Sequence, residues 1–323
     1  MSFNPGKFLI FGFKGSSPNP DFLKLIEGNP PAGFLLLGDN YKDDKQLGAL
    51  TTELKSITGN DTLFTVDQEP GRVQRFKGSF PISKKPQHYL KPGNTPEFRA
   101  WCSATAEKMA ELDFGVNLAP LVDLWPQDVE YPVLNDRSFG DDPERVTEFA
   151  EILIEEFKKF KIITCAKHFP GLGAATGDPH EVMATSNDKL ERFLEYHWRP
   201  YKAVVKGDIK LIMTTHLKCS ALDSQNCATY SSNVISHLRN SVGYQGVIIS
   251  DDLYMAGAHI GKSAGEATID SICAGHNLLI ISRDLAFQSE AVLAIKKRFE
   301  EDPAFATIAF ENEKKLKTLK DAS

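Results

Sequence analysis

Short apolar runs rich in strand-forming residues, each bounded by turn residues, recur eight times along the chain. They lie at residues 8–13, 33–37, 63–66, 115–120, 162–166, 211–215, 246–250 and 277–282. The stretches between them have helical character; the one that begins at Asp142 repeats apolar residues every three to four positions as far as Phe157. Alternating strands and helices predict a parallel sheet, and eight such units are the number that closes a (β/α)8 barrel of the TIM type.

An open, doubly wound sheet is the main alternative arrangement of these elements. No glycine-rich dinucleotide turn follows the first strand, where the chain reads Gly12-Phe13-Lys14-Gly15, and this disfavours such a sheet. The 323 residues divided among eight units leave about 40 for each, which suits a whole barrel with long loops. We therefore expect one barrel domain over residues 1–323, with the lysine-rich segment 300–323 forming a helix on the outside of the barrel.

Charge and composition narrow the classes of partner. The chain carries 37 basic and 43 acidic side chains, for a net charge of −6, and so has no basic excess to bind nucleic acid or an anionic membrane. No apolar run approaches the roughly 20 residues of a membrane span, and the first one is too short for a signal-peptide core. The five cysteines include no Cys-x-x-Cys pair, which disfavours a disulfide framework and a structural zinc site. We expect a cytoplasmic protein with no obligate protein partner.

Charged or histidine residues follow six of the eight predicted strands, at the end where barrel enzymes hold their active sites. A single one could be a solvated residue of the rim, but six are better explained by a polar pocket. In chain order they are Asp67 and Glu69, on either side of Gln68; Asp123, with Arg137 further along its loop; Lys167 and His168; His216; Asp251 and Asp252; and Arg283.

Two groups near these strand ends have the chemistry of catalysis. Asp251 follows an apolar run directly, so its carboxylate emerges from rigid backbone, as suits a nucleophile; the alternative is a helix cap, which Asp252 fits better. Asp178 and His180 lie two apart in a Gly- and Pro-rich loop. A carboxylate beside an imidazole fixes its tautomer and raises its basicity, so the pair can act as general acid and base. A pair of this kind in a loop is nevertheless more often structural.

Five further polar residues have side chains suited to a polyhydroxylated substrate. Charged groups make the stronger hydrogen bonds, and a guanidinium can grip two oxygens at once. For each arginine, a salt bridge within the loop is the competing interpretation. The candidates are Asp67, Arg75, Arg137, Lys167 and His168.

At these residues the chain resembles the β-N-acetylhexosaminidases of glycoside hydrolase family 3, in particular the single-domain bacterial enzymes of peptidoglycan recycling. Five short segments carry the resemblance in family order and together span most of the chain. They are VDQEPGRVQRF (66–76), NLAPLVD (117–123), DRSFG (136–140), AKHFPG (166–171) and SDDLYM (250–255).

The resemblance implies a retaining glycosidase that releases terminal N-acetylglucosamine without a cofactor or metal. Asp251 falls on the nucleophile of the family, His180 on its histidine acid/base, and Asp178 on the carboxylate that polarises that histidine. The five candidates for substrate binding fall on positions that hold N-acetylglucosamine in the −1 subsite. In the implied reaction Asp251 attacks the anomeric carbon while protonated His180 donates to the departing oxygen. Water then hydrolyses the glycosyl-enzyme with neutral His180 as base.

Three positions depart from the family pattern. Leu172 stands where the family has a loop histidine, and Pro179 stands where it has the serine between the aspartate and the acid/base histidine. A proline stiffens the loop and removes a backbone donor. Pro70 replaces a glycine in the first motif. None of the three removes a residue with an implied chemical role, but the first two lie in the loop of the acid/base and bear on its mobility.

Other functions stay open on the sequence. Within the family, a β-glucosidase, an exo-glycosidase of the chitobiose type or a phosphorylase would use the same machinery. Lys167 could form a Schiff base, as in barrel aldolases. His168, His180, His216 and Asp251 could hold a metal for hydrolysis, although no His-x-His occurs at the first strand. A sugar-binding barrel without turnover is the alternative from another class, and the retained catalytic candidates disfavour it.

Overall fold

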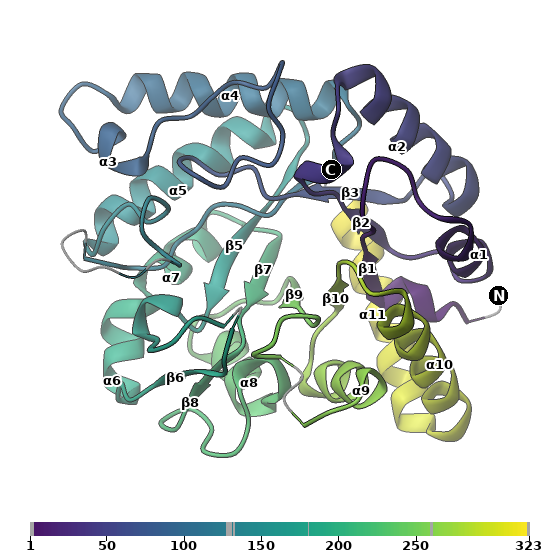
Figure 1. Cartoon of the computed structure of the whole chain (residues 1–323). Helices are drawn as coiled ribbons and strands as arrows, with labels where there is room; N and C mark the ends of the chain where they lie inside the picture. The colour runs from purple at the N-terminus through teal and green to yellow at the C-terminus, as the bar shows by residue number, and fades with distance from the viewer. Residues whose placement is uncertain (1–2, 127–130, 132, 180, 259–260, 322–323) are drawn as a thin grey trace.

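The computed structural model describes residues 3–126, 131, 133–179, 181–258 and 261–321. Its eight parallel main strands close into a barrel in the order β1-β10-β9-β7-β5-β4-β3-β2, and helices surround them (Figure 1). The predicted barrel is confirmed, and every predicted run overlaps one barrel strand. These strands are β1 (Leu9–Phe11), β2 (Gly33–Leu35), β3 (Leu63–Val66), β4 (Val116–Asn117), β5 (Ile163–Phe169), β7 (Leu211–Thr214), β9 (Val247–Asp252) and β10 (Leu278–Ile281).

Seven of the described α-helices begin at a residue whose side chain accepts from a backbone N–H of the first turn. The Asp142 side chain accepts from the N–H of Glu144 at 2.9 Å and starts α5. Ser263 and Glu266 form a capping box that starts α9. None of the described helices is long and apolar enough to cross a bilayer. The helices are α1 (Pro20–Gly28), α2 (Asp44–Thr58), α3 (Pro86–Tyr89), α4 (Thr95–Glu111), α5 (Pro143–Lys158), α6 (Leu190–Arg192), α7 (Arg199–Lys206), α8 (Ser232–Asn240), α9 (Ala264–Ala274), α10 (Leu285–Glu301) and α11 (Pro303–Lys320).

Side chains alternate between the inside of the barrel and the helices around it, as the period of two in a strand requires. In β9, Val247 and Ile249 belong to the interior apolar cluster, whereas Ile248 packs in the cluster shared with the helices. In β5, Ile163 and Cys165 are interior residues in the same way. The interior is therefore a packed core and not a channel.

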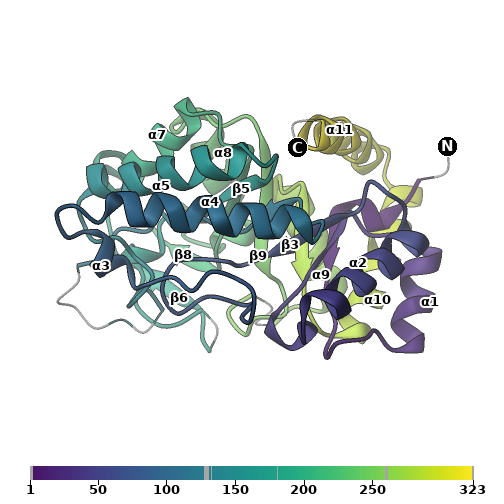
Figure 2. The same ribbon diagram turned by 90° about the horizontal axis from the view of Figure 1, so that it is seen from above.

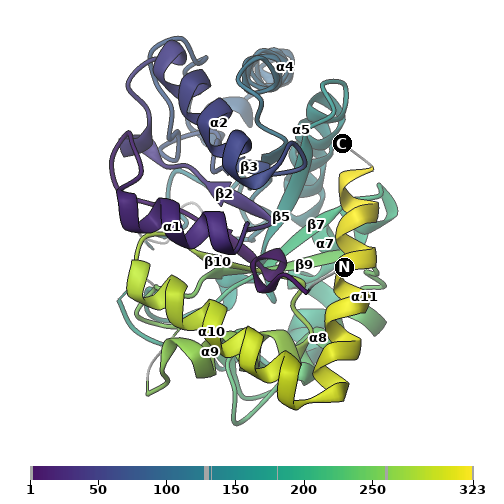
Figure 3. The same cartoon turned by 90° about the vertical axis from the view of Figure 1, so that its right-hand side faces the viewer.

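The C-terminal segment forms α11, which closes one end of the barrel. Its Leu316 and Leu319 belong to the interior apolar cluster, and the helix lies apart from the ring of the other helices (Figures 2 and 3). Asn277, just before β10, donates its side-chain amide to Asn312 at 3.0 Å and ties the helix to the barrel. The predicted helix on the outside of the barrel is therefore present. Its place at the open end was not predicted, and it lies there because the interior side chains at that end need an apolar cover.

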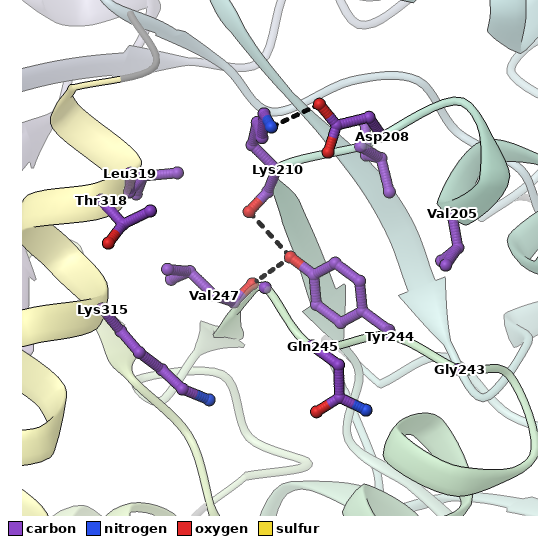
Figure 4. Close-up of a pocket in the computed structure, with 12 residues that line it drawn as sticks. Val205, Asp208, Lys210, Gly243, Tyr244, Gln245, Val247, Lys315, Thr318 and Leu319 are labelled. Atoms are coloured by element: carbon purple, nitrogen blue, oxygen red, sulfur yellow. Dashed lines mark hydrogen bonds and ion pairs between the residues drawn. The ribbon is translucent and has the colours of Figure 1, made fainter.

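A cavity of about 440 Å³ lies beside α11 at this end. The Tyr244 hydroxyl lies 2.7 Å from the carbonyl oxygens of both Lys210 and Val247. Figure 4 shows these contacts, with Lys315 and Thr318 of α11 on the facing wall. Lys210 and Val247 lie where β7 and β9 begin. The polar strand ends lie at the opposite face, where barrel enzymes carry their chemistry.

Two strands outside the barrel shape the loops at that opposite face. β6 (Ala184–Ser186) pairs in parallel with β8 (Leu217–Cys219). The sequence did not predict them, because three-residue strands are too short to show a period of two. Since β6 ends the loop that follows β5, this pairing fastens the far end of that loop.

Candidate active site

The inward faces of three strands lead to charged side chains at one end of the barrel. Counted by twos from the interior positions 63, 163 and 247 of β3, β5 and β9, the same face reaches Asp67, Lys167 and Asp251. All three line a cavity of about 190 Å³. The period of two and the closure of the barrel therefore bring together residues that are far apart in the chain.

This cavity collects most of the residues that the sequence singled out. Asp178 is half-buried in the loop before Pro179, which forms part of the wall. His180 lies outside the described residues. The predicted residues in the lining are Asp67, Arg75, Arg137, Lys167, His168 and Asp251, and the others are Arg72, Val73, Val133, Leu172, Pro179 and Met213.

Glu69, a fully buried carboxylate, holds two of the predicted binding residues. Its Oε2 accepts from Arg137 Nε at 2.9 Å and its Oε1 from Arg137 Nη2 at 2.8 Å. Lys167 Nζ lies 2.7 Å from Glu69 Oε1 and 2.7 Å from Asp67 Oδ1. Arg75 Nη2 lies 3.3 Å from the other oxygen of Asp67. The sequence placed Glu69 at a strand end without a role, because only the fold shows which cations surround it.

Opposite charges set the protonation states in this network. Burial alone would raise the pKa of both Asp67 and Glu69. The charges of Lys167 and Arg75 outweigh burial and lower the pKa of Asp67, and those of Arg137 and Lys167 do the same for Glu69. Burial alone would lower the pKa of Lys167, but the two carboxylates raise it. A lysine held in its charged form lacks the electron pair of a Schiff-base nucleophile, so the network disfavours the aldolase hypothesis.

Asp123 orients His168 and the chain that follows it. Its Oδ2 lies 2.7 Å from His168 Nδ1 and accepts from the backbone N–H of His168 at 3.1 Å. Its Oδ1 accepts from the N–H of Leu172 at 2.6 Å. With Nδ1 against a carboxylate, Nε2 is the ring nitrogen available to the cavity. The Lys167–His168 and Phe169–Pro170 peptide bonds in this segment are cis.

Asp251 and Asp252 have different surroundings although they are adjacent. Asp251 is half-buried in the cavity wall, and its Oδ1 accepts from the backbone N–H of Asp252 at 2.8 Å. Asp252 Oδ1 accepts from the N–H groups of Tyr254 and Ser282, each at 3.1 Å, and Oδ2 accepts from the Ser282 hydroxyl. Asp252 thus stabilises the turn after β9, and Asp251 is the carboxylate that faces the cavity.

His216 directs both ring nitrogens toward the protein. Nδ1 lies 2.7 Å from the Thr229 hydroxyl and Nε2 lies 2.9 Å from the carbonyl oxygen of Asp252. His168, another member of the hypothetical metal site, is bound to Asp123. In the parts of the chain that the structure describes, which exclude His180, no group of three or more His, Cys, Asp or Glu side chains could hold a metal ion.

The chain is similar to known proteins over most of its length. Residues 15–302 match the glycosyl hydrolase family 3 N-terminal domain. A beta-hexosaminidase of Actinobacillus pleuropneumoniae serotype 5b is 30% identical over 282 residues, which cover 85% of this chain and 81% of that protein.

Two solved structures have the same barrel. A glycoside hydrolase family 3 beta-N-acetylglucosaminidase from Paenibacillus superposes with a TM-score of 0.90 at 24% identity, over 98% of this chain and 62% of its own length. NagZ from Neisseria gonorrhoeae, in complex with N-trifluoroacetyl-D-glucosamine, gives a TM-score of 0.80 at 24% identity, over 90% of this chain and 86% of its own. At these identities the likeness concerns the fold. Since the family domain matches most of the sequence, the chain belongs to glycosyl hydrolase family 3.

Proposed function

We propose that this protein is a retaining β-N-acetylhexosaminidase that releases terminal, non-reducing N-acetylglucosamine from muropeptides derived from peptidoglycan. The observation that carries the proposal is that Asp251 lines the same cavity as Asp67, Lys167 and His168. The relative from Actinobacillus pleuropneumoniae is named a beta-hexosaminidase, and the Neisseria gonorrhoeae structure holds a glucosamine derivative. Both names support the same class of substrate.

In the proposed first step, a carboxylate oxygen of Asp251 bonds to the anomeric carbon as the glycosidic C–O bond breaks. The electron pair of that bond goes to the leaving oxygen, which takes a proton from His180, and Asp178 stabilises the charge of the imidazole. In the second step neutral His180 takes a proton from water, the water oxygen bonds to the anomeric carbon, and Asp251 leaves as a carboxylate. A histidine paired with an aspartate thus replaces one of the usual two carboxylates.

The residues around Asp251 suit a bound sugar. Asp67 and His168 offer acceptors for hydroxyl groups, while the cations offer donors. Four cationic side chains (Arg72, Arg75, Arg137 and Lys167) and two carboxylates line the cavity, and Glu69 behind the wall pairs with Arg137 and Lys167. We also propose a reducing, cytoplasmic location, which the five free thiols support.

Trapping the intermediate tests the nucleophile directly. A fluorinated N-acetylglucosaminyl fluoride should label the protein, and mass spectrometry should find the label on Asp251. Asp251→Ala should lose activity on 4-nitrophenyl N-acetyl-β-glucosaminide by many powers of ten, whereas loss of the general acid costs about 10²- to 10⁴-fold. Asp302→Ala, which removes the N-terminal cap of α11, is a control that should keep activity. A label elsewhere, or turnover by Asp251→Ala near that of the wild type, contradicts the assignment.

A substrate panel tests the finer parts of the proposal. A muropeptide, chitobiose and an aryl β-glucoside separate the three exo-glycosidase activities, and phosphate in the buffer separates hydrolysis from phosphorolysis. We expect the highest kcat/KM on the muropeptide, the free sugar as product, and β configuration in the first-formed product by NMR. Preference for the glucoside, or a sugar 1-phosphate as product, would replace the proposal by one of the alternatives.

A further inference from the structure

The loop that follows β5 carries Asp178 and is fastened at both ends. At its start, Trp198 Nε1 donates to the carbonyl of Pro170 at 2.9 Å, and the N–H of Leu172 donates to Asp123. At its end, the backbones of Thr176 and Thr185 exchange hydrogen bonds of 2.7 and 3.0 Å, and β6 pairs with β8. These contacts hold the ends, and a second set holds the middle.

Tyr131, from the loop after β4, reaches the residue that precedes Asp178. Its hydroxyl donates to the carbonyl oxygen of Gly177 at 2.9 Å, and its ring lies 4.9 Å from that of Trp125. The residue is only 8% exposed. Burial raises the pKa of the phenol, and the negative charges of Asp178 and Asp123 raise it further. Tyr131 is therefore a neutral donor at any working pH, fixed within electrostatic reach of Asp178.

Leu172 supplies an apolar anchor within the same loop. It is 1% exposed, and it also lines the cavity. Its apolar neighbours form a small cluster, separate from the barrel interior, to which the loops after β4 and β5 and the strands β6 and β8 contribute. This loop cluster consists of Leu121, Tyr131, Val133, Leu134, Leu172, Ala175, Ala184 and Leu217. A polar ring at position 172 would have to be buried among these side chains, whereas leucine stabilises the cluster.

We propose that Tyr131 and Leu172 are positioning residues, which hold the Asp178 segment over the cavity so that proton transfer to the leaving group occurs from one fixed arrangement. The inference rests on the proposed function, in which Asp178 polarises the acid/base. A general acid must lie within hydrogen-bond reach of the leaving oxygen, and small displacements of a catalytic group lower the rate steeply. The hydroxyl of Tyr131 fixes the backbone beside Asp178, and the Leu172 side chain fixes the loop against the barrel.

The dependence of the rate on the leaving group tests this role. A 2,4-dinitrophenolate departs without a proton, whereas a sugar or a methylumbelliferyl group depends on the general acid. Tyr131→Phe removes only the hydroxyl and should lower kcat/KM about 5-fold for the poor leaving groups, the effect of about one hydrogen bond. Leu172→Ala should lower it about 10- to 100-fold, because it frees a longer part of the loop. With the dinitrophenyl substrate both variants should stay within about twofold of the wild type.

Two reference variants make the outcomes distinct. Tyr196→Phe removes a hydroxyl that donates to the carbonyl of Asp141 at 2.8 Å, away from the cavity. This variant should leave kcat/KM unchanged for every substrate. Asp178→Ala should show the steepest dependence on the leaving group; if it shows none, the proposed acid/base fails. The positioning role is overturned if Asp178→Ala shows a dependence on the leaving group but Tyr131→Phe and Leu172→Ala do not, either because they lower kcat/KM equally for all substrates or because they leave it unchanged. Thermal unfolding checks that each variant is folded. If Leu172→Ala is unfolded, the result for Tyr131→Phe alone decides whether the positioning role holds.

Discussion

Replacing Glu69 with glutamine perturbs the network that holds the binding residues while it keeps the shape of the side chain. The carboxylate of Glu69 contacts Arg137 through two hydrogen bonds and Lys167 through one ion pair, all between 2.7 and 2.9 Å. A glutamine offers one acceptor oxygen and turns an NH₂ group toward a cation. Arg137 and Lys167 would then be buried with too little negative charge around them.

The expected size of the effect follows from the burial of this pair. Removing one partner of a buried ion pair costs about 3–5 kcal/mol, and we expect a loss of this order in the free energy of unfolding of Glu69→Gln. A hydrogen bond between charged groups is worth about 1.5–3 kcal/mol. If the loss of orientation of Arg137 and Lys167 weakens substrate binding by the equivalent of one such bond, kcat/KM should fall about 10- to 100-fold, since 1.4 kcal/mol is a factor of ten.

The pH dependence gives the prediction a sign. Burial would raise the pKa of Glu69, but Arg137 and Lys167 lower it below the ordinary 4.5. A lowered folded-state pKa means that Glu69 stabilises the fold fully above pH 4.5 and less as the pH falls through the folded-state value. The difference in unfolding free energy between wild type and Glu69→Gln should therefore be constant near neutrality and shrink in acid.

The assays are urea unfolding across pH and kcat/KM on 4-nitrophenyl N-acetyl-β-glucosaminide. Glu156→Gln is the matched control, because Glu156 of α5 is 2% exposed and contacts Arg99 of α4 and Lys159 at the end of α5, outside the cavity. It should lose stability and keep activity. The reasoning is refuted if Glu69→Gln matches the wild type in both assays, or if Glu156→Gln lowers kcat/KM as much.

Three further predictions concern other parts of the barrel. Burial lowers the pKa of His276 from 6.5 to about 4. As the pH is lowered from 6.5 to 4, the unfolded state gains a proton before the folded state, so the free energy of unfolding should fall by up to roughly 3 kcal/mol. In urea unfolding, His276→Asn should reduce this pH dependence, and a wild-type free energy that is constant over the range argues against the prediction. Leu316→Ala should cost about 2–5 kcal/mol in urea unfolding with kcat unchanged, and a lower kcat would mean that the closed end of the barrel affects the chemistry. A Cβ at Gly173 would lie 1.9 Å from the carbonyl oxygen of Leu124, so Gly173→Ala should displace the loop and lower kcat/KM at least tenfold. Gly48→Ala, in open space, should not.

Local patterns in the sequence were enough to predict the barrel and the charged residues at the ends of its strands. Asp67, Lys167 and Asp251 stand at the ends of three predicted apolar runs, which placed them at the active end of the barrel. Both faces of β3 and β5 are buried, so the runs themselves do not distinguish the face inside the barrel from the face that packs on the helices. The predicted strands 162–166 and 246–250 nevertheless ended too early, since β5 extends to Phe169 and β9 to Asp252. Polar side chains interrupted the apolar signal there, while the backbone continued to pair with its neighbours.

Contacts between distant segments were decided only by the tertiary structure. Glu69 meets Arg137 across 68 residues and Asp123 meets His168 across 45, and no local period records such pairs. The same holds for α11 at the closed end of the barrel and for Tyr131 against the loop of Asp178. Hydrophobic periodicity is a property of neighbouring residues, whereas a buried charge or a docked loop depends on what the whole fold places beside it. The sequence by itself thus determined the barrel and the polar residues at its strand ends, and packing between distant segments decided which of these residues meet and how they are held.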